Sequence, residues 1–281
     1  MLAVRALTIR QDRRTVLAGA SFTARRGAVT GLIGPNGVGK TTLLRAIAGL
    51  LPRPLPENGA VTFDGRPLPE RARERARLIG YLPQGHAVHW PLTVRRTVEL
   101  GRLPHLGPLG RLGPKDVAAV ERVMAATGIA ALSARAVSSL SGGERARVML
   151  ARVLAADAPL LLADEPVAAL DPGHQLRLMA LLRDEAVVRN RAVLVVLHDL
   201  SLAARCCDDV VLLTPDGPCL SGPASSVLMP GPLSAAYGVP FLVTQAAGVP
   251  LVIPTLPAIP ETGVPDHAPS PDPSPDPSPD R

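Results

Sequence analysis

The hydrophobic residues of the chain are grouped in short runs that alternate with stretches of helical periodicity. Five of these runs are apolar and are followed by turn or polar residues: 29–33, 78–82, 160–163, 193–197 and 210–213. Short runs of this kind predict central strands buried on both faces. Because helical patterns separate them and no repeat of solenoid period is present, we predict an α/β domain built on a mainly parallel sheet.

Strand signals stop between Gly85 and Ala158. Alanine-rich helical patterns take over there, and a Gly/Pro-rich stretch at residues 101–114 interrupts them. Glycine and proline in such numbers end helices instead of continuing them. We therefore predict a helical subdomain inserted at about residues 86–157 of a domain that covers residues 1–254.

The chain after Met229 holds a short apolar stretch and then changes in composition. The apolar stretch contains Tyr237, Phe241 and Leu251, and it predicts a small pair of strands. Residues 269–280 read PSPDPSPDPSPD, a solvated sequence prone to polyproline conformation. We expect residues 255–281 to form a disordered tail and assign no fold to them.

The composition indicates a globular chain and gives little support to nucleic-acid binding. Of 281 residues, 47% are hydrophobic, which is enough for a sizeable core, whereas only 2% are aromatic. So few aromatic side chains leave little material for stacking single-stranded bases. The net charge of +6 arises from 30 Lys and Arg against 24 Asp and Glu.

The densest basic cluster is Arg71, Arg73, Arg75 and Arg77. Glu70 and Glu74 each precede an arginine of this cluster by three residues, the spacing of ion pairs on a helix surface. We therefore predict a solvated helix face here in preference to a nucleic-acid patch.

Cysteine usage and hydropathy indicate a chain that works in the cytosol. The three cysteines, Cys206, Cys207 and Cys219, form no CxxC pair and are expected to be free thiols packed in the fold. The N-terminal sequence lacks the apolar core of a signal peptide, and the longest wholly apolar run, 192–197, is far shorter than the ~18 residues that span a bilayer. Any work at a membrane is therefore expected to need a partner.

A phosphate-binding loop is predicted at residues 34–41, which read GPNGVGKT. This GxxxxGK[ST] motif follows an apolar strand and precedes a helical pattern at residues 42–48, the context that the motif requires. Glycines let backbone N–H groups surround a β-phosphate, Lys40 can reach the β and γ oxygens, and Thr41 can ligate Mg²⁺. The alternative is a glycine-rich turn with an accidental lysine. The candidate nucleotide-binding residues are Gly34, Pro35, Asn36, Gly37, Val38, Gly39, Lys40, Thr41 and Thr42.

An acidic element follows at residues 160–165, which read LLLADE. The two carboxylates end an apolar strand, at the edge where open α/β sheets bind their ligands. Asp164 would hold the magnesium ion, and Glu165 would act as general base on the attacking water. An exposed strand end with a solvated acidic pair is the alternative, and the upstream GPNGVGKT makes it much weaker.

The segment LSGGE at residues 140–144 makes the chain resemble the nucleotide-binding subunits of ATP-binding-cassette transporters, whose signature it is. Ser141, Gly142 and Gly143 begin a helical pattern, so their free N–H groups and the helix dipole can meet a phosphate. By themselves these residues would form a plain helix cap. The resemblance spans residues 2–254. It implies a P-loop NTPase (RecA-like) core with an N-terminal antiparallel β subdomain and an inserted α-helical subdomain.

Further positions match the family residue by residue. The resemblance implies that Gln84 contacts Mg²⁺ or the lytic water and senses the membrane subunit, and that His198 contacts the γ-phosphate. Residues 168–171, AALD, match the loop whose Asp171 lies at the dimer interface. Taken alone, Gln84 and His198 would be ordinary polar residues.

One family feature is missing, and one metal reading is weak. The family usually stacks adenine on an aromatic residue about 25 positions before the phosphate loop, yet residues 7–16, LTIRQDRRTV, contain none. An aliphatic or arginine face, with looser base selectivity, is the expected substitute. His86 and His89 have no third ligand of suitable spacing, which favours a loop over a metal site.

The resemblance also implies partners. Two subunits pair head to tail, so that Ser141 and Gly143 of one copy meet the ATP held by the other, and opening after hydrolysis reaches the membrane partners through the Gln84 region. This places a homodimer peripherally on the cytoplasmic face of the plasma membrane, with integral permease subunits and a periplasmic or surface substrate-binding protein. ATP and Mg²⁺ are the implied cofactors, and no nucleic acid is expected.

Three segments resemble importers of ferric siderophores, haem or vitamin B12: residues 91–105, residues 197–213 and AAYGVP near Tyr237. Importers of zinc, manganese or amino acids remain alternatives. A soluble cassette ATPase acting on nucleic acid is disfavoured, because there is one cassette and no long coiled-coil insertion. A non-hydrolysing regulator is disfavoured by the presence of Glu165 and His198.

Overall fold

The central sheet has six strands in the order β10-β9-β3-β8-β7-β6, and all neighbours are parallel except β10 and β9. The strands are β3 (Ala28–Ile33), β6 (Ile79–Leu82), β7 (Leu160–Ala163), β8 (Ala192–Val196), β9 (Asp209–Leu212) and β10 (Leu220–Pro223). The computed structural model describes residues 1–11, 14–51, 58–85, 91–107, 110–168, 170–215 and 217–256. All five predicted strands, and the parallel sheet that they form, are confirmed.

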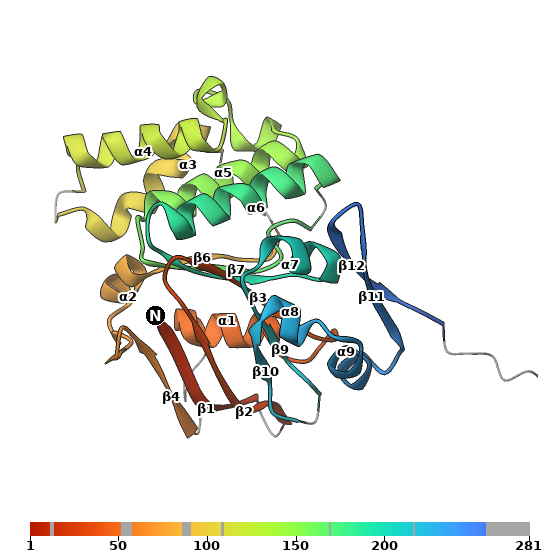
Figure 1. Cartoon of the computed structure of the whole chain (residues 1–281). Helices are drawn as coiled ribbons and strands as arrows, with labels where there is room; N and C mark the ends of the chain where they lie inside the picture. The colour runs from red at the N-terminus through yellow and green to blue at the C-terminus, as the bar shows by residue number, and fades with distance from the viewer. Residues whose placement is uncertain are drawn as a thin grey trace, which may run out of the picture.

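The strands β3, β7 and β8 are buried along their whole length because both faces of the sheet are covered there. Along β7, Leu160 and Leu162 pack into one buried cluster, whereas Leu161 and Ala163 pack into another. The first cluster includes α1 (Lys40–Ala48), and the second includes α5 (Gly142–Ala155), α6 (Pro172–Val187) and α7 (Leu200–Cys206). Figure 1 shows α1 on one side of the central strands and α5 and α6 on the other. The alternation of side chains along each strand thus serves two cores.

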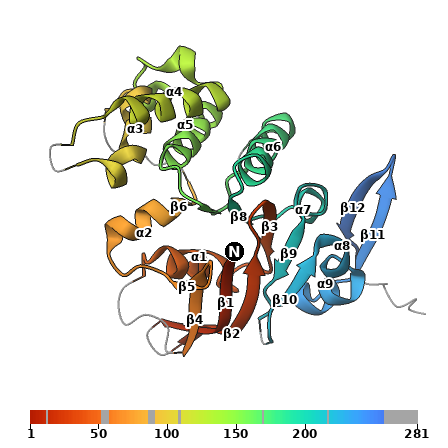
Figure 2. The ribbon, with the colours of Figure 1, turned by 60° about the vertical axis from the view of Figure 1, so that its left-hand side comes forward.

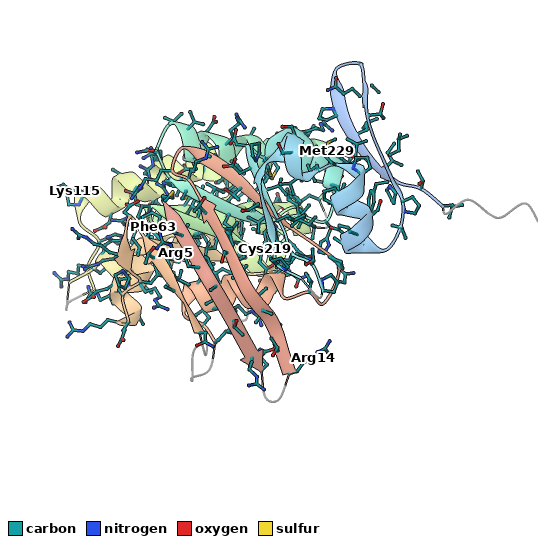
Figure 3. All side chains as sticks on the ribbon, turned by 60° about the horizontal axis from the view of Figure 1, so that its bottom comes forward. Arg5, Arg14, Phe63, Lys115, Cys219 and Met229 are labelled. Atoms are coloured by element: carbon teal, nitrogen blue, oxygen red, sulfur yellow. The ribbon has the colours of Figure 1, made fainter. Side chains whose placement is uncertain are left out.

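A second, antiparallel sheet covers α1 from the far side. Its strands follow the order β2-β1-β4-β5 and are β1 (Leu2–Gln11), β2 (Arg14–Ala24), β4 (Asn58–Phe63) and β5 (Arg66–Pro67). Figure 3 shows Arg5, Arg14 and Phe63 on these strands. The buried residues of β1 and β2 share a cluster with Leu43 and Leu44 of α1. The antiparallel β subdomain implied by the family resemblance is present.

The helical elements between β6 and β7 form a separate layer, which Figure 2 shows beside α6 and away from the antiparallel sheet. They are α3 (Val94–Glu99), η1 (Leu100–His105), α4 (Pro114–Ala126), η2 (Ala130–Leu132), η3 (Val137–Ser139) and α5. The inserted helical subdomain is therefore confirmed. Its limits at residues 86 and 157 stay a prediction, and residues 86–90, with His86 and His89, lie outside the described part of the chain.

The basic cluster lies on α2 (Ala72–Leu78) and its N-cap Arg71, and this helix has no buried residues, as predicted for a solvated face. The predicted pairing of its arginines is wrong, however. Arg73 and Arg77 donate to the carbonyl of Pro104, at 3.1 and 2.7 Å, and Glu74 lies 3.4 Å from Arg71. The last carbonyls of a helix such as η1 lack partners within it, and they attract these guanidinium groups. The arginines therefore tie α2 to the helical layer.

The C-terminal part consists of α8 (Ala224–Val227), α9 (Pro230–Tyr237), β11 (Phe241–Ala246) and β12 (Val249–Pro254). The last two strands form the predicted antiparallel pair, although Tyr237 ends a helix instead of joining a strand. Of the predicted tail at residues 255–281, residues 257–281 lie outside the described residues.

No helix in the described ranges is both long and apolar enough to cross a bilayer.

Candidate functional site

The topology of the central sheet brings the predicted site residues to one edge. In a parallel sheet the carboxyl ends of neighbouring strands lie side by side, and β3, β8, β7 and β6 are consecutive neighbours. Gly34 directly follows β3, Asp164 follows β7, and His198 and Gln84 come two residues after β8 and β6. Motifs separated by more than a hundred residues therefore meet in one place.

The phosphate loop needs glycine at Gly34 and Gly39 for steric reasons. Gly34 has a φ of 146°, and a Cβ there would lie 2.6 Å from the carbonyl oxygen of Leu213. Gly39 has a φ of 103°, and its Cβ would lie 3.0 Å from the carbonyl oxygen of Val16. L-residues rarely adopt these angles, and backbone atoms cannot move aside as a side chain can. These two positions of the loop therefore carry no side chain, which leaves their backbone uncovered next to the start of α1.

Lys40, the first residue of α1, is buried inside this loop with 6% of its surface exposed. Its Nζ donates to the carbonyls of Gly34 and Pro35, at 2.7 and 2.9 Å. Burial lowers the pKa of the ammonium group, and the charges of Glu165 and Asp164 oppose that shift. A buried cation beside free N–H groups at a helix start is an arrangement that binds a phosphate anion.

Asp164 is fully buried at the end of β7 and has two hydroxyl partners. The Thr41 hydroxyl donates to its Oδ1 at 3.1 Å, and the Tyr81 hydroxyl donates to its Oδ2 at 3.3 Å. Burial raises the pKa of the Asp164 carboxyl, and these two hydrogen bonds oppose the rise. The carboxylate of Asp164 and the hydroxyl of Thr41 are hard oxygen donors of the kind that Mg²⁺ prefers. Within the described residues there is no group of three or more His, Cys, Asp or Glu side chains that could hold a metal ion.

Glu165 is held between two of the predicted polar residues. The amide of Gln84 donates to its Oε2 at 2.8 Å, and Nε2 of His198 lies 2.6 Å from its Oε1. The backbone of Glu165 has a φ of 50°, a conformation that is strained for a residue other than glycine. Gln84 and His198 thus fix the carboxylate at the sheet edge.

The LSGGE segment is built as a helix start, away from this edge. Ser141 is the N-cap of α5: its backbone N–H donates to Glu144 Oε2 at 2.9 Å, and its Oγ accepts from the backbone N–H of Glu144 at 3.3 Å. This capping box leaves the N–H groups of Gly142 and Gly143 free to meet a ligand. Among the described residues, no hydrogen bond or ion pair joins Ser141, Gly142 or Gly143 to the phosphate loop.

Asp171 also has a local role in the chain. It is the N-cap of α6 and accepts from the backbone N–H of His174 at 2.9 Å, while its other oxygen contacts the His174 ring. Hydrogen bonds from His174 hold the pKa of this carboxyl below its usual value. Asp171 is exposed and makes none of its described contacts with the phosphate loop. Whether it binds nucleotide, as expected from the family, stays a prediction.

Two residues of the site were not among the predicted site residues. The chain has two tyrosines, and both hydroxyls lie at this edge: Tyr81 binds Asp164, and Tyr237 accepts a hydrogen bond from the backbone N–H of Gly34 at 3.1 Å. Their rarity in a chain with 2% aromatic residues is the signal that could have identified them.

Comparison with known proteins is consistent with this geometry. A protein-family model described as "ABC transporter" matches residues 17–168, a segment that ends before Tyr237. The hemin import ATP-binding protein HmuV of Streptomyces coelicolor is 44% identical over 261 residues, which cover 90% of each chain.

Two further proteins extend the comparison. The cobalamin import ATP-binding protein BtuD of Halobacterium salinarum is 43% identical over 237 residues, and the match spans 84% of this chain but 58% of that longer protein. The structure of cbiO1 from Clostridium perfringens, part of the ABC transporter complex cbiONQ, superposes with a TM-score of 0.71 at 27% identity. This superposition covers 83% of this chain and 92% of that one.

Proposed function

Because the chain belongs to the ABC transporter family, we propose that it is the ATP-hydrolysing subunit of an importer for an iron complex or cobalamin. The observation that carries the proposal is the Glu165 carboxylate, which is fixed between Gln84 and His198 beside the phosphate loop. A regulator that only bound nucleotide would have no use for a carboxylate positioned in this way.

The first step is binding of the triphosphate. Lys40 leaves the carbonyls of its own loop and binds the β and γ oxygens, while N–H groups of the loop and of the α1 start surround the β-phosphate. Burial of Lys40 strengthens its attraction for the anion, because little water screens the charge. Thr41 and Asp164 are the residues that would hold a magnesium ion, whose chemistry is to neutralise charge on the β and γ oxygens.

Hydrolysis uses Glu165 as the general base. Its carboxylate takes a proton from the attacking water as the new P–O bond forms, and the bond between the γ-phosphorus and the ADP oxygen breaks. His198 contacts Glu165, so it orients the base and, once ATP is bound, binds a γ oxygen. Gln84 holds the second carboxylate oxygen until substrate arrives and then orients the water.

A second copy of the chain completes the site. The free N–H groups at the start of α5 and the Ser141 hydroxyl have no bond to the phosphate loop of their own chain, so we assign them to the ATP held by the partner. Binding of ATP closes the pair, and loss of the γ-phosphate after hydrolysis lets it open. Asp171, at the exposed start of α6, lies in the segment expected to cross between the copies.

Movement reaches the membrane subunits through the segment around Gln84. This residue follows β6, and α2, which precedes β6, is fastened to η1 by Arg73 and Arg77. The glutamine therefore lies where the sheet meets the helical layer. We place the protein peripherally on the cytoplasmic face of the membrane, bound to integral permease subunits that a substrate-binding protein supplies with cargo.

The names of the relatives support the proposed cargo class. One relative is named as a hemin importer subunit and another as a cobalamin importer subunit, both at more than 40% identity. We assign no contact with the cargo to any of the described residues. Uptake of radiolabelled haem, ferric siderophore and cobalamin by a deletion strain, with and without the restored gene, identifies the cargo. Full uptake of all three by the deletion strain would exclude the assignment.

The variant Glu165→Gln tests the ATPase. We expect it to bind ATP as the wild type does, to release phosphate at least a hundredfold more slowly, and to accumulate as a dimer with ATP, because only the base is lost. The measurements are phosphate release and size-exclusion chromatography with ATP. Turnover of Glu165→Gln at the wild-type rate would remove the general base from the mechanism.

A further inference from the structure

The C-terminal segment, which we define as α9, β11 and β12 (residues 230–254), contacts the phosphate loop at one point and α7, which follows His198, at another. At the first, the hydroxyl of Tyr237 accepts a hydrogen bond from the backbone N–H of Gly34. At the second, the Ser201 hydroxyl of α7 exchanges hydrogen bonds with both backbone groups of Val252, at 2.9 and 3.2 Å. Figures 1 and 2 show this segment at the edge of the molecule, beside α7 and α8, and Figure 3 places Met229, just before it, far from Lys115 of the helical layer.

Gly34 needs a partner from outside the sheet. The parallel pairings of β3 end with Leu32 opposite Val196 and with Ile33 opposite Leu212, so the ladder stops one residue before Gly34. Gly34 is buried, and an unpaired N–H at such a place is costly. A side chain from the last helix of the described chain supplies the acceptor.

Both peptide groups of Gly34 are therefore hydrogen-bonded, one by a lysine of the same loop and the other by a tyrosine of the C-terminal segment. Its N–H is bound by Tyr237, and its carbonyl is bound by Lys40 Nζ at 2.7 Å. The Leu213 carbonyl oxygen lies close to Gly34 on another side, because a Cβ added at Gly34 would lie only 2.6 Å from it. The position of the Tyr237 hydroxyl thus limits where the first residue of the phosphate loop can lie.

We propose that Tyr237 is a positioning residue for the phosphate loop: its hydroxyl fixes the Gly34 peptide, and through it the loop entered by ATP. This inference rests on the proposed ATPase function and adds to it a residue beyond the segment that the family model matches.

The surroundings of Tyr237 suit this role. Its ring meets Phe241 edge to face, with 5.6 Å between ring centroids, and it packs against the larger buried cluster. Burial raises the pKa of Tyr237 to about 12, so the hydroxyl stays neutral at physiological pH. Because β12 is also bound to α7, which begins just after His198, the same segment joins two sides of the site.

The variant Tyr237→Phe removes the acceptor and keeps the ring. We expect the Kd for ATP of the full-length chain, measured by competition with a fluorescent ATP analogue, to rise about tenfold, because a buried N–H loses its partner and the loop loses its fixed entry. KM should rise with Kd, and kcat should stay within about twofold, since Glu165 and His198 are untouched. The matched control is Leu242→Ala, at an exposed position of β11, which should leave both constants at wild-type values.

A role in stability alone gives a different pattern. It would lower the melting temperature and the fraction of active protein, and hence the apparent kcat, without changing Kd or KM for the molecules that remain folded. That pattern, or wild-type constants in Tyr237→Phe, would overturn the inference and leave the proposed ATPase intact. A wild-type chain that bound no ATP would overturn the proposed function and this inference together.

Discussion

Two glycines of the phosphate loop provide a matched pair of substitutions for alanine. Gly34 and Gly37 both have positive φ, 146° and 79°. They differ in their surroundings, because a Cβ at Gly34 would lie 2.6 Å from the Leu213 carbonyl oxygen and 3.1 Å from a Val38 methyl group, whereas nothing lies within 4 Å of a Cβ at Gly37. Gly37→Ala therefore measures backbone strain alone, whereas Gly34→Ala combines backbone strain with steric overlap.

The expected losses of stability follow from this geometry. Gly37→Ala should cost about 1 kcal/mol, the strain of a left-handed residue reduced by the entropy that alanine removes from the unfolded chain. Gly34→Ala adds overlap with a backbone atom that cannot turn aside, so it should cost about 4 kcal/mol from strain and overpacking together. The difference of about 3 kcal/mol corresponds to roughly a 150-fold change in the unfolding equilibrium constant.

Urea denaturation of the two full-length variants, followed by circular dichroism, measures this difference. The melting temperature of each variant in saturating ATP adds a second test. Gly34→Ala should lose the stabilisation that ATP gives the wild type, because the substitution displaces the Gly34 carbonyl that binds Lys40. Equal destabilisation of the two variants, within about 0.5 kcal/mol, would show that the Leu213 carbonyl does not confine the loop.

Three further outcomes are expected. Lys40→Ala should abolish nucleotide binding or hydrolysis, because the buried cation of the loop is lost; unchanged affinity and turnover would count against the phosphate-loop assignment. Asp64→Asn should destabilise the protein by about 1 kcal/mol or less at pH 7, since Asp64 is 47% exposed and its main partner is Arg26. Hydrogen bonding to Arg26 lowers the pKa of Asp64 from 3.8 to about 2. The difference in unfolding free energy between Asp64→Asn and wild type should therefore be present above about pH 4 and vanish as the pH falls toward 2. A difference independent of pH in urea titrations would refute this. GTP should be hydrolysed with a kcat/KM within about tenfold of that for ATP, because residues 7–16 contain no aromatic residue to stack the base; a selectivity above a thousandfold in competition assays would contradict this.

The sequence predicts those parts of the fold and the site that depend on local patterns. The buried strands are visible as short apolar runs, and each is followed by the residues that the sheet brings to one edge, such as Gly34 and Asp164. Parallel topology does the rest, because it aligns the carboxyl ends of the strands whatever the length of the connections. The proximity of Lys40, Thr41 and Asp164 was predictable for this reason.

Contacts between distant segments without a motif were not predictable. Helix spacing suggested glutamate partners for Arg73 and Arg77, but both arginines bind the Pro104 carbonyl, because the end of η1 happens to lie above α2. Helix-surface ion pairs contribute only a few tenths of a kcal/mol, so a carbonyl in a better position readily replaces them. The pairing of charges was thus decided by tertiary packing.

The two halves of the proposed ATP site illustrate a further limit. Both GPNGVGKT and LSGGE are visible in the sequence, and each forms the expected helix start, at α1 and at α5. Their separation in the fold follows from the connection: α5 belongs to the helical layer, whereas α1 lies beneath the central sheet, on the face that the antiparallel strands cover. One chain therefore carries a loop that can bind phosphate and a second helix start with free N–H groups, yet it does not bring them together. In two copies related by a two-fold axis, the α5 start of each copy would meet the nucleotide bound by the phosphate loop of the other. The fold of the single chain therefore supports a pair of copies.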